Sequence, residues 1–165
     1  MTNYRLPDGN REIAFSGALL AQSSSDDGRA QRWLDLKLYK TDTNRYVLHR
    51  VGRSVVYHAV GSTCTRQAQP RVAAELYKPS SELLPCVRCN PPNIYAPDVP
   101  VDTEVLLEQD RNSVTVCERA PGLVESLYGV DDKGTRFLSR VAQRLLEEAS
   151  AVDSAIRDAW AVQTV

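Results

Sequence analysis

Apolar and polar residues alternate with a period of two through much of the first 60 residues. The alternation is clearest in residues 11–22 and 32–40, and it is the pattern of a half-buried β-strand. The turn signal Thr-Asp-Thr-Asn follows, after which residues 45–51 return as a strand and the β-branched residues 54–60 extend the sheet. We therefore expect an antiparallel sheet of about four strands over residues 11–60.

Helical spacing replaces this alternation towards the end of the chain. Residues 103–109 and 113–118 flank Asp-Arg-Asn and predict a β-hairpin. A short helix is predicted over residues 120–127, because Pro121 suits the first helical position. The strongest helical repeat covers residues 135–152. Asp153 or Ser154 then caps a final helix, which carries the apolar residues Ile156, Ala159 and Trp160.

These elements predict the α+β class, with an N-terminal antiparallel β-sheet, a zinc-knuckle segment, a β-hairpin and C-terminal helices. A short helix over residues 71–77 precedes the knuckle. The proline-rich residues 93–102 form a stiff connector. It separates a basic β-sheet with its zinc-binding segment, residues 1–92, from a β-hairpin and acidic helical segment, residues 103–165. We expect these parts to pack as one compact unit.

The formal net charge of −1 over 165 residues conceals an asymmetry. Residues 1–95 hold 13 basic and 8 acidic side chains, whereas residues 96–165 hold 7 basic and 13 acidic ones. The total excludes a uniformly basic coat for nucleic acid, but it permits one basic face. No apolar run is long enough to span a membrane and the N-terminus carries no secretory signal, so we expect a cytoplasmic protein with no membrane partner.

Three cysteines and one histidine predict a structural zinc (Zn2+) site. Cys86 and Cys89 are spaced Cys-x2-Cys between prolines, which lets both thiolates reach one tetrahedral ion from a tight turn. Upstream, His58 and Cys64 flank turn residues, so their side chains can converge as well. Cys117 is the competing fourth ligand, although it lies in an alternating run where cysteine usually packs as a small apolar group. The spacing leaves His58 and Cys117 as alternatives and favours His58.

The segment from His58 to Pro92 resembles the metal-binding module of the Ada DNA-repair family. That family closes its zinc site with a Pro-Cys-x-x-Cys-x-Pro motif, which residues 85–91 match. The resemblance covers about 35 of the 165 residues. It implies a small zinc-organised fold near nucleic acid. The first ligand of the family is a cysteine that accepts a methyl group from a DNA phosphotriester, and an imidazole at His58 cannot do so, so methyl transfer is not implied.

The sequence favours nucleic acid as the ligand. Arginines, whose guanidinium groups suit phosphate geometry, are interleaved with tyrosines that can stack on unpaired bases. Basic residues and tyrosines gather before and within the zinc segment, with His49 among them. The candidate contact residues are Arg45, Arg50, Arg53, Arg66, Arg71, Arg88, Tyr46 and Tyr57.

Two other function classes are open. The acidic C-terminal helices can bind a protein partner, with Trp160 as an anchor, although its helical spacing with Ile156 also suits a residue that closes the core. An enzyme is disfavoured because the sequence lacks a phosphate-binding loop, a nucleophile elbow and a His-Glu-x-x-His motif. We therefore expect a zinc-stabilised binding protein without a catalytic residue, and the sequence does not predict its oligomeric state.

Overall fold

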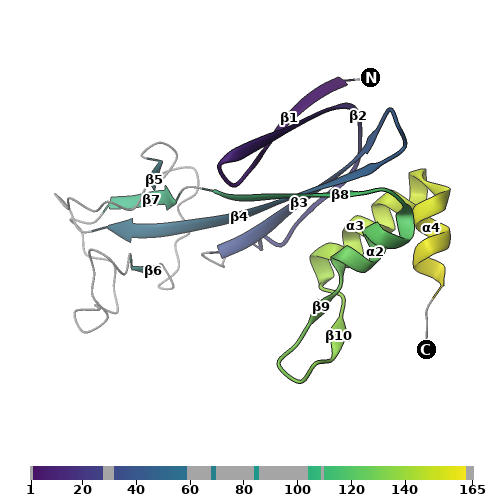
Figure 1. Cartoon of the computed structure of the whole chain (residues 1–165). Helices are drawn as coiled ribbons and strands as arrows, with labels where there is room; N and C mark the ends of the chain where they lie inside the picture. Colours follow the sequence, from purple (N-terminus) through teal and green to yellow (C-terminus); the bar gives the residue numbers. More distant parts are fainter. Residues whose placement is uncertain are drawn as a thin grey trace. The chain divides into compact units, whose positions relative to one another are not determined.

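The N-terminal part of the chain forms four strands, β1 (Thr2–Asp8), β2 (Arg11–Ser24), β3 (Arg32–Thr41) and β4 (Tyr46–His58) (Figure 1). The structure is a computed structural model that describes residues 2–27, 32–58, 68–69, 84–85, 104–108 and 110–162, with side chains for residues 2–27, 32–54 and 110–162. Each of the four strands is hydrogen-bonded to the next, and β8 (Arg111–Cys117) pairs with β4. The expected antiparallel sheet is therefore present.

The sheet is curled. Hydrogen bonds join the turn between β1 and β2 to β8, although three other strands separate β1 from β8 in the strand order. Asp8 pairs with Arg11, and Gly9 adopts a positive φ of 62° in the two-residue turn between them, which glycine tolerates best. The Gly9 N–H donates to the Asn112 carbonyl at 2.9 Å, and the Val114 N–H donates to Asp8 Oδ1 at 3.0 Å. The Val114 hydrogen bond and the Arg11 guanidinium hold the pKa of Asp8 below its ordinary value.

Three helices pack with this sheet: α2 (Ala120–Leu127), α3 (Arg140–Val152) and α4 (Ser154–Ala161) (Figure 1). α3 lies against β2, and α4 contacts both other helices. Aliphatic side chains from both layers fill the core between them, and burying each one contributes about 1.5–3 kcal/mol. The fully buried core residues include Leu36, Leu38 and Leu48 from the strands and Leu123, Leu145, Leu146 and Ile156 from the helices.

A second, smaller apolar cluster contains Leu6, Tyr39 and Val47 from three strands of the curled sheet. Tyr4 and Phe15 are directly opposite each other on β1 and β2, and both pack against it. The ring centroid of Tyr39 lies 4.7 Å from that of Tyr4 and 5.4 Å from that of Phe15. Burial raises the pKa of Tyr39. This cluster holds the β1–β2 hairpin in its curled position.

Several predicted boundaries need correction. β1 is absent from the sequence prediction, because Pro7 weakens the strand signal there. The strands predicted over residues 45–51 and 54–60 form the single strand β4. The helix predicted over residues 135–152 begins at Arg140, where Ser139 Oγ accepts a hydrogen bond from the Ala142 N–H. Its first residues instead form β10 (Arg136–Phe137), which pairs with β9 (Gly129–Val130).

The predicted hairpin over residues 103–118 is wrong. Its two halves are β7 (Glu104–Glu108) and β8, and each pairs with β4. β7 takes the end of β4, from Val55 opposite Leu107 to His58 opposite Glu104. Among the residues that the structure describes, β7 and β8 are not paired with each other. Both strands pair with β4, which lies far away in the sequence, and a hairpin between neighbouring strands does not form in the described part of the chain.

The chain divides into two compact units. The first contains Met1–Ser25, Leu34–Val51 and Asn112–Val165, and thus combines the N-terminal strands with the C-terminal helices. The second contains Asp26–Trp33 and Gly52–Arg111. In the second unit, β7 also pairs with β5 (Ala68–Gln69), and β6 (Leu84–Pro85) runs parallel to β4. The predicted connector, residues 93–102, and the predicted helix, residues 71–77, lie outside the described residues.

Candidate functional site

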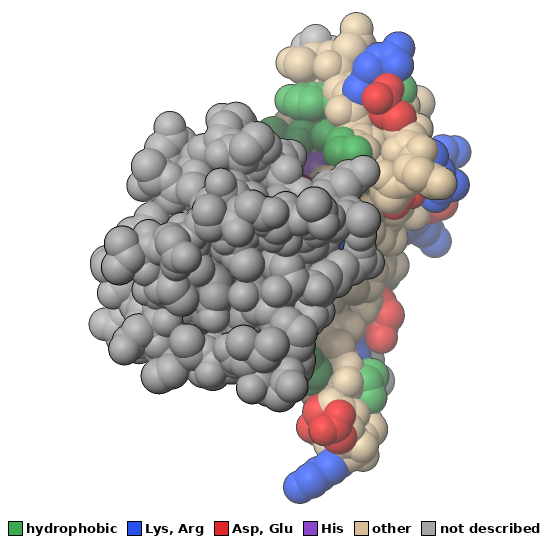
Figure 2. Space-filling model, turned by 90° about the vertical axis from the view of Figure 1, so that its left-hand side faces the viewer, with side chains coloured by type: hydrophobic (Ala, Val, Ile, Leu, Met, Phe, Trp, Pro, Cys, Tyr) green, Lys and Arg blue, Asp and Glu red, His purple; other side chains and the backbone are tan. Residues whose placement is uncertain are grey.

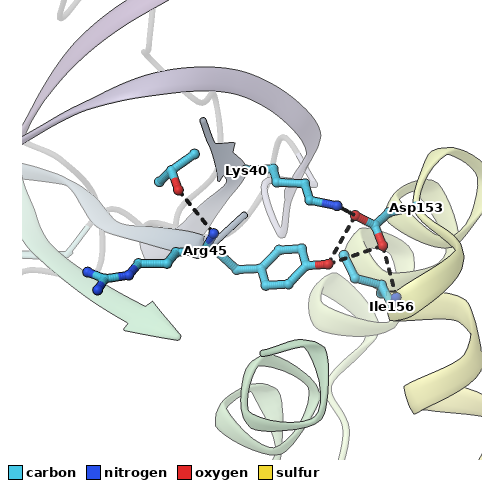
Figure 3. A network of polar contacts seen from close by, with 6 residues as sticks. Lys40, Arg45, Asp153 and Ile156 are labelled. Carbon is cyan, nitrogen blue, oxygen red and sulfur yellow. Dashed lines mark hydrogen bonds and ion pairs between the residues drawn. The ribbon is translucent and has the colours of Figure 1, made fainter. Parts of the chain in front are cut away.

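Asp153 joins the sheet to the last helix (Figure 3). Its carboxylate is almost fully buried and accepts hydrogen bonds from Lys40 Nζ at 2.8 Å and from the Tyr46 hydroxyl at 3.1 and 3.2 Å. It also caps α4, accepting a hydrogen bond from the Ile156 N–H at 3.1 Å. Of the two predicted caps, Asp153 and Ser154, the structure has Asp153, and the network fixes the position of α4 on β3 and β4.

The electrostatics of this network favour the charged pair. Burial opposes ionisation of Asp153, but hydrogen bonds from Lys40, the Ile156 amide and Tyr46 outweigh burial and hold the pKa of the carboxyl below its ordinary value. The Asp153 carboxylate in turn raises the pKa of Lys40. Burial, together with Asp153, raises the pKa of Tyr46. Lys40 is thus a paired ammonium ion, which is unsuited to act as a nucleophile or general base at neutral pH.

A groove lies beside α4, and we call it the aromatic groove. Its cavity has a volume of about 610 Å³. Residues from α2, β10 and α4 contribute its walls, and most of them are apolar or aromatic. They are Pro121, Val124, Glu125, Tyr128, Arg136, Ala159, Trp160 and Val162.

Tyr128 and Arg136 form a preorganised wall of the aromatic groove. The guanidinium carbon of Arg136 lies 3.8 Å from the centroid of the Tyr128 ring, and Arg136 Nη2 forms an ion pair with Glu125. The β9–β10 turn supports this wall, because Asp131 Oδ1 accepts hydrogen bonds from the N–H groups of Lys133 and Thr135. Trp160 is half-buried, packs against the main core and also lines the groove. Both roles considered for Trp160, core residue and exposed anchor, are compatible with this position.

A second cavity, of about 450 Å³, adjoins the aromatic groove at Pro121 and Ala159, which line both. We call it the polar cavity, because charged side chains and the beginning of α2 contribute to its walls. Its other lining residues are Lys40, Asn44, Tyr46, Glu118, Arg119, Ala120, Ala155 and Asp158. The lining residues of the aromatic groove are mainly apolar or aromatic, whereas those of the polar cavity include four charged side chains, Lys40, Glu118, Arg119 and Asp158.

Four of the predicted nucleic-acid contacts have described side chains, and two of them have structural roles. Tyr46 is only 3% exposed, so its ring offers no surface on which a base can stack. Arg50 donates to Thr115 Oγ1 at 3.1 Å and to the Ser126 carbonyl at 2.6 Å, and burial lowers its pKa. Arg45 is exposed and forms an ion pair with Glu118 at 3.1 Å, whereas Arg53 is half-buried.

The other four predicted nucleic-acid contacts have no described side chain. The side chain of Tyr57 and the residues Arg66, Arg71 and Arg88 lie outside the described part of the chain. His49 is buried, with Nε2 at 2.9 Å from Asn112 Oδ1. On the face drawn in Figure 2, the described basic and acidic side chains are interspersed and form no continuous basic patch.

The predicted zinc site lies almost entirely outside the described residues, as Cys64, Cys86 and Cys89 all do. The backbone of His58 belongs to β4, but its side chain is not described. Cys117, the competing ligand, is buried in the main core, and burial raises the pKa of its thiol. This confirms the expectation that Cys117 packs as an apolar residue. Within the described ranges, no three His, Cys, Asp or Glu side chains are grouped to hold a metal ion.

Comparisons of this chain with protein-family models, curated proteins and solved structures find no match. Among the described helices, none is both long and apolar enough to cross a membrane. Of these groove residues, the sequence pattern indicated Trp160 but not Tyr128 or Arg136. The Asp-Asp-Lys-Gly turn before Arg136 is the signal that indicates the β9–β10 hairpin, since Gly134 adopts a φ of 78° there.

Proposed function

We propose that this protein is a binding protein, and that it holds a segment of a protein partner in the aromatic groove. One observation carries the proposal. Trp160 and Tyr128 line a single groove whose other walls are mainly Pro121, Val124, Ala159 and Val162. Aromatic side chains dominate the energetics of protein interfaces, and grooves lined by them are typical sites for extended or helical peptides.

Exposed apolar side chains at and beside the groove support a binding role. Val162 is 75% exposed, and Val130 and Phe137 of the neighbouring β9–β10 hairpin are also exposed. Burying such apolar area against a partner contributes roughly 25 cal/mol per Å² before the costs of association. The Asp153 network holds α4 in position before a partner arrives, which lowers the ordering cost on binding.

Selection from a phage-displayed random peptide library tests this function. We expect peptides with bulky apolar residues to be enriched on the wild-type protein. Enrichment should fall to background on a Trp160→Ala variant, because the variant lacks the anchor. A Val152→Ala variant is the control, since Val152 is an exposed apolar residue that lines neither cavity. Equal enrichment on the wild type and on Trp160→Ala would contradict the proposal.

A second proposal is that a zinc-held basic segment contacts nucleic acid. The Cys3His spacing and the balance of 13 basic against 8 acidic residues in positions 1–95 support it. With Tyr46 buried and Arg50 bonded within the fold, the contacts proposed here are Arg45, Arg53, Arg66, Arg71, Arg88 and Tyr57. Neither Arg45 nor Arg53, the two of these residues with described side chains, lines the aromatic groove.

Filter binding of a labelled single-stranded oligonucleotide at two salt concentrations tests the second proposal. Phosphate contacts release counterions, so binding should be strongest at low salt and should weaken steeply as salt rises. Changing Arg66, Arg71 and Arg88 together to Ala should weaken binding for oligonucleotides of any sequence. Absence of binding at low salt would remove this candidate function.

A further inference from the structure

The side chains that line the aromatic groove and the polar cavity favour particular residue types in the partner segment. We propose that this segment is an acidic-apolar peptide, with a carboxylate bound near Arg119 in the polar cavity and a bulky apolar side chain bound against Trp160 in the aromatic groove. This inference rests on the proposed peptide-binding function. It adds a charge preference to that function, and the evidence for the preference comes from the second cavity.

Among the described residues around the polar cavity, one cation takes part in no ion pair. Glu118 is paired with Arg45 at 3.1 Å, and Asp158 lies 3.7 Å from its neighbour Arg157. Lys40 is neutralised by Asp153 at 2.8 Å. Arg119 is exposed and lines the cavity, and none of the ion pairs within the described ranges includes it. An incoming carboxylate therefore meets a guanidinium that is available for bidentate hydrogen bonds.

The beginning of α2 adds to this positive charge. Arg119 is the N-cap residue, and its side chain does not cap the helix. The first turn of α2 contains no acidic residue, and the carboxylate next to it in the sequence, Glu118, is paired with Arg45. Ala120 and Pro121, the first residues of α2, line the polar cavity. The field in this cavity thus favours an anionic group over a cationic one.

The aromatic groove supplies the apolar half of the recognition. Its own two charges, Glu125 and Arg136, are paired with each other, so the groove presents no unpaired charge to the ligand. The two cavities share the uncharged residues Pro121 and Ala159, and the proposed segment extends across these two residues from one cavity to the other. Complementarity of charge at one end and of apolar surface at the other predicts the peptide composition.

Fluorescence anisotropy with labelled synthetic peptides tests the charge preference. The probes join Glu-Glu or Lys-Lys to Leu-Phe through glycine-serine spacers of varied length and in both orders. We expect the best Glu-Glu probe to bind about fivefold more tightly than its Lys-Lys counterpart at low salt, with the advantage shrinking as salt rises. An Arg119→Glu variant should reverse the preference. Arg140→Glu, an equal charge change at an exposed residue that lines neither cavity, should leave it unchanged.

The outcomes separate this inference from the proposed function. If both probes bind equally and Trp160→Ala abolishes binding of both, the groove binds peptides and the charge preference is refuted. If no probe binds, or if Trp160→Ala binds as the wild type does, the proposed function fails as well. A labelled oligonucleotide that binds the wild type but not Arg119→Glu, while no peptide binds, would assign this surface to nucleic acid and would also overturn the inference. Circular dichroism spectra of the variants establish that each one is folded.

Discussion

At the scale of single residues, Asp153 links α4 to two strands of the sheet. It is 6% exposed and accepts hydrogen bonds from β3, β4 and its own helix. Removing one partner of such a buried pair leaves the other partner desolvated without compensation. The sequence predicted Asp153 only as one of two candidate helix caps, because Lys40 and Tyr46 lie more than 100 positions away.

Two substitutions at Asp153 distinguish the contribution of its negative charge to stability from the contribution of its helix cap. Asp153→Asn keeps a capping oxygen and should lower the free energy of unfolding by about 2–3 kcal/mol, since Lys40 loses its counter-ion. Asp153→Ala removes the cap as well and should cost about 1 kcal/mol more. Asp158→Ala, an exposed change on the same helix, should stay within about 0.5 kcal/mol of the wild type. Urea unfolding at pH 7 measures all three, and an Asp153→Asn variant as stable as the wild type would refute this role.

The contribution of Asp153 should depend on pH. Its pKa is lower in the folded protein than in the unfolded chain, so its stabilising effect is fully present above the unfolded value of about 4. The effect is lost as the pH falls through the folded pKa. The difference in unfolding free energy between the wild type and Asp153→Asn should therefore shrink as the pH falls below about 4. A difference that stays constant from pH 7 to pH 3 in urea titrations would argue against the ion pair.

At the scale of elements, Gly17 marks the closest approach between β2 and β3. A Cβ atom built at this position would lie 2.2 Å from the Lys40 carbonyl oxygen and 2.9 Å from the Thr41 Cα. Both atoms belong to the backbone of a paired strand and cannot move aside cheaply. The glycine in the Ile-Ala-Phe-Ser-Gly run is therefore needed for strand pairing, which the alternation of the sequence does not reveal.

Two glycine-to-alanine substitutions should have opposite effects. Gly17→Ala should destabilise the protein by about 3 kcal/mol, because the new methyl group overlaps the backbone of β3. Gly122→Ala should stabilise it by about 0.5 kcal/mol, because Gly122 lies in α2 with no atom within 4 Å of an added Cβ and alanine favours the helix. Thermal and urea unfolding of both variants measure the difference. Similar effects of the two changes would contradict the predicted close packing at Gly17.

Local signals predicted helices better than strand partners. The helix over residues 120–127 is confirmed at α2, and the last helix begins after Asp153 as predicted. Helices form hydrogen bonds within the segment, so periodicity and caps indicate them locally. Strand partners are set by distant residues. The Asp-Arg-Asn sequence predicted a hairpin, but pairing with β4 determines where β7 and β8 lie.

At the scale of the whole molecule, the zinc prediction concerns residues outside the described ranges. Protein purified without chelator should contain about one zinc ion per chain, measured by elemental analysis. Cys86→Ser should lose the ion and should lower the melting temperature, because metal affinity contributes to folding. Zinc content well below one per chain in the wild type would contradict the predicted site.

Two further variants distinguish His58 from Cys117 as the fourth zinc ligand. Cys117 is buried among core residues, so Cys117→Ala should keep its zinc while losing some packing energy. His58→Gln should lose zinc affinity. Zinc loss in Cys117→Ala, with zinc retained in His58→Gln, would reverse the assignment that the sequence favoured.

The sequence by itself determined the α+β class, most strands of the first unit and the three C-terminal helices apart from the start of α3. It narrowed the cap of the last helix to Asp153 or Ser154 and favoured a packing role for Cys117. Each of these depends on local periodicity or local hydrogen bonding, which a short stretch of residues carries. Tertiary structure alone decided that Tyr46 faces the core, that Arg50 bonds to β8 and α2, and that Tyr128 and Trp160 line one groove. The partners in these contacts lie far apart along the chain, and only the folding of the helices onto the curled sheet brings them together.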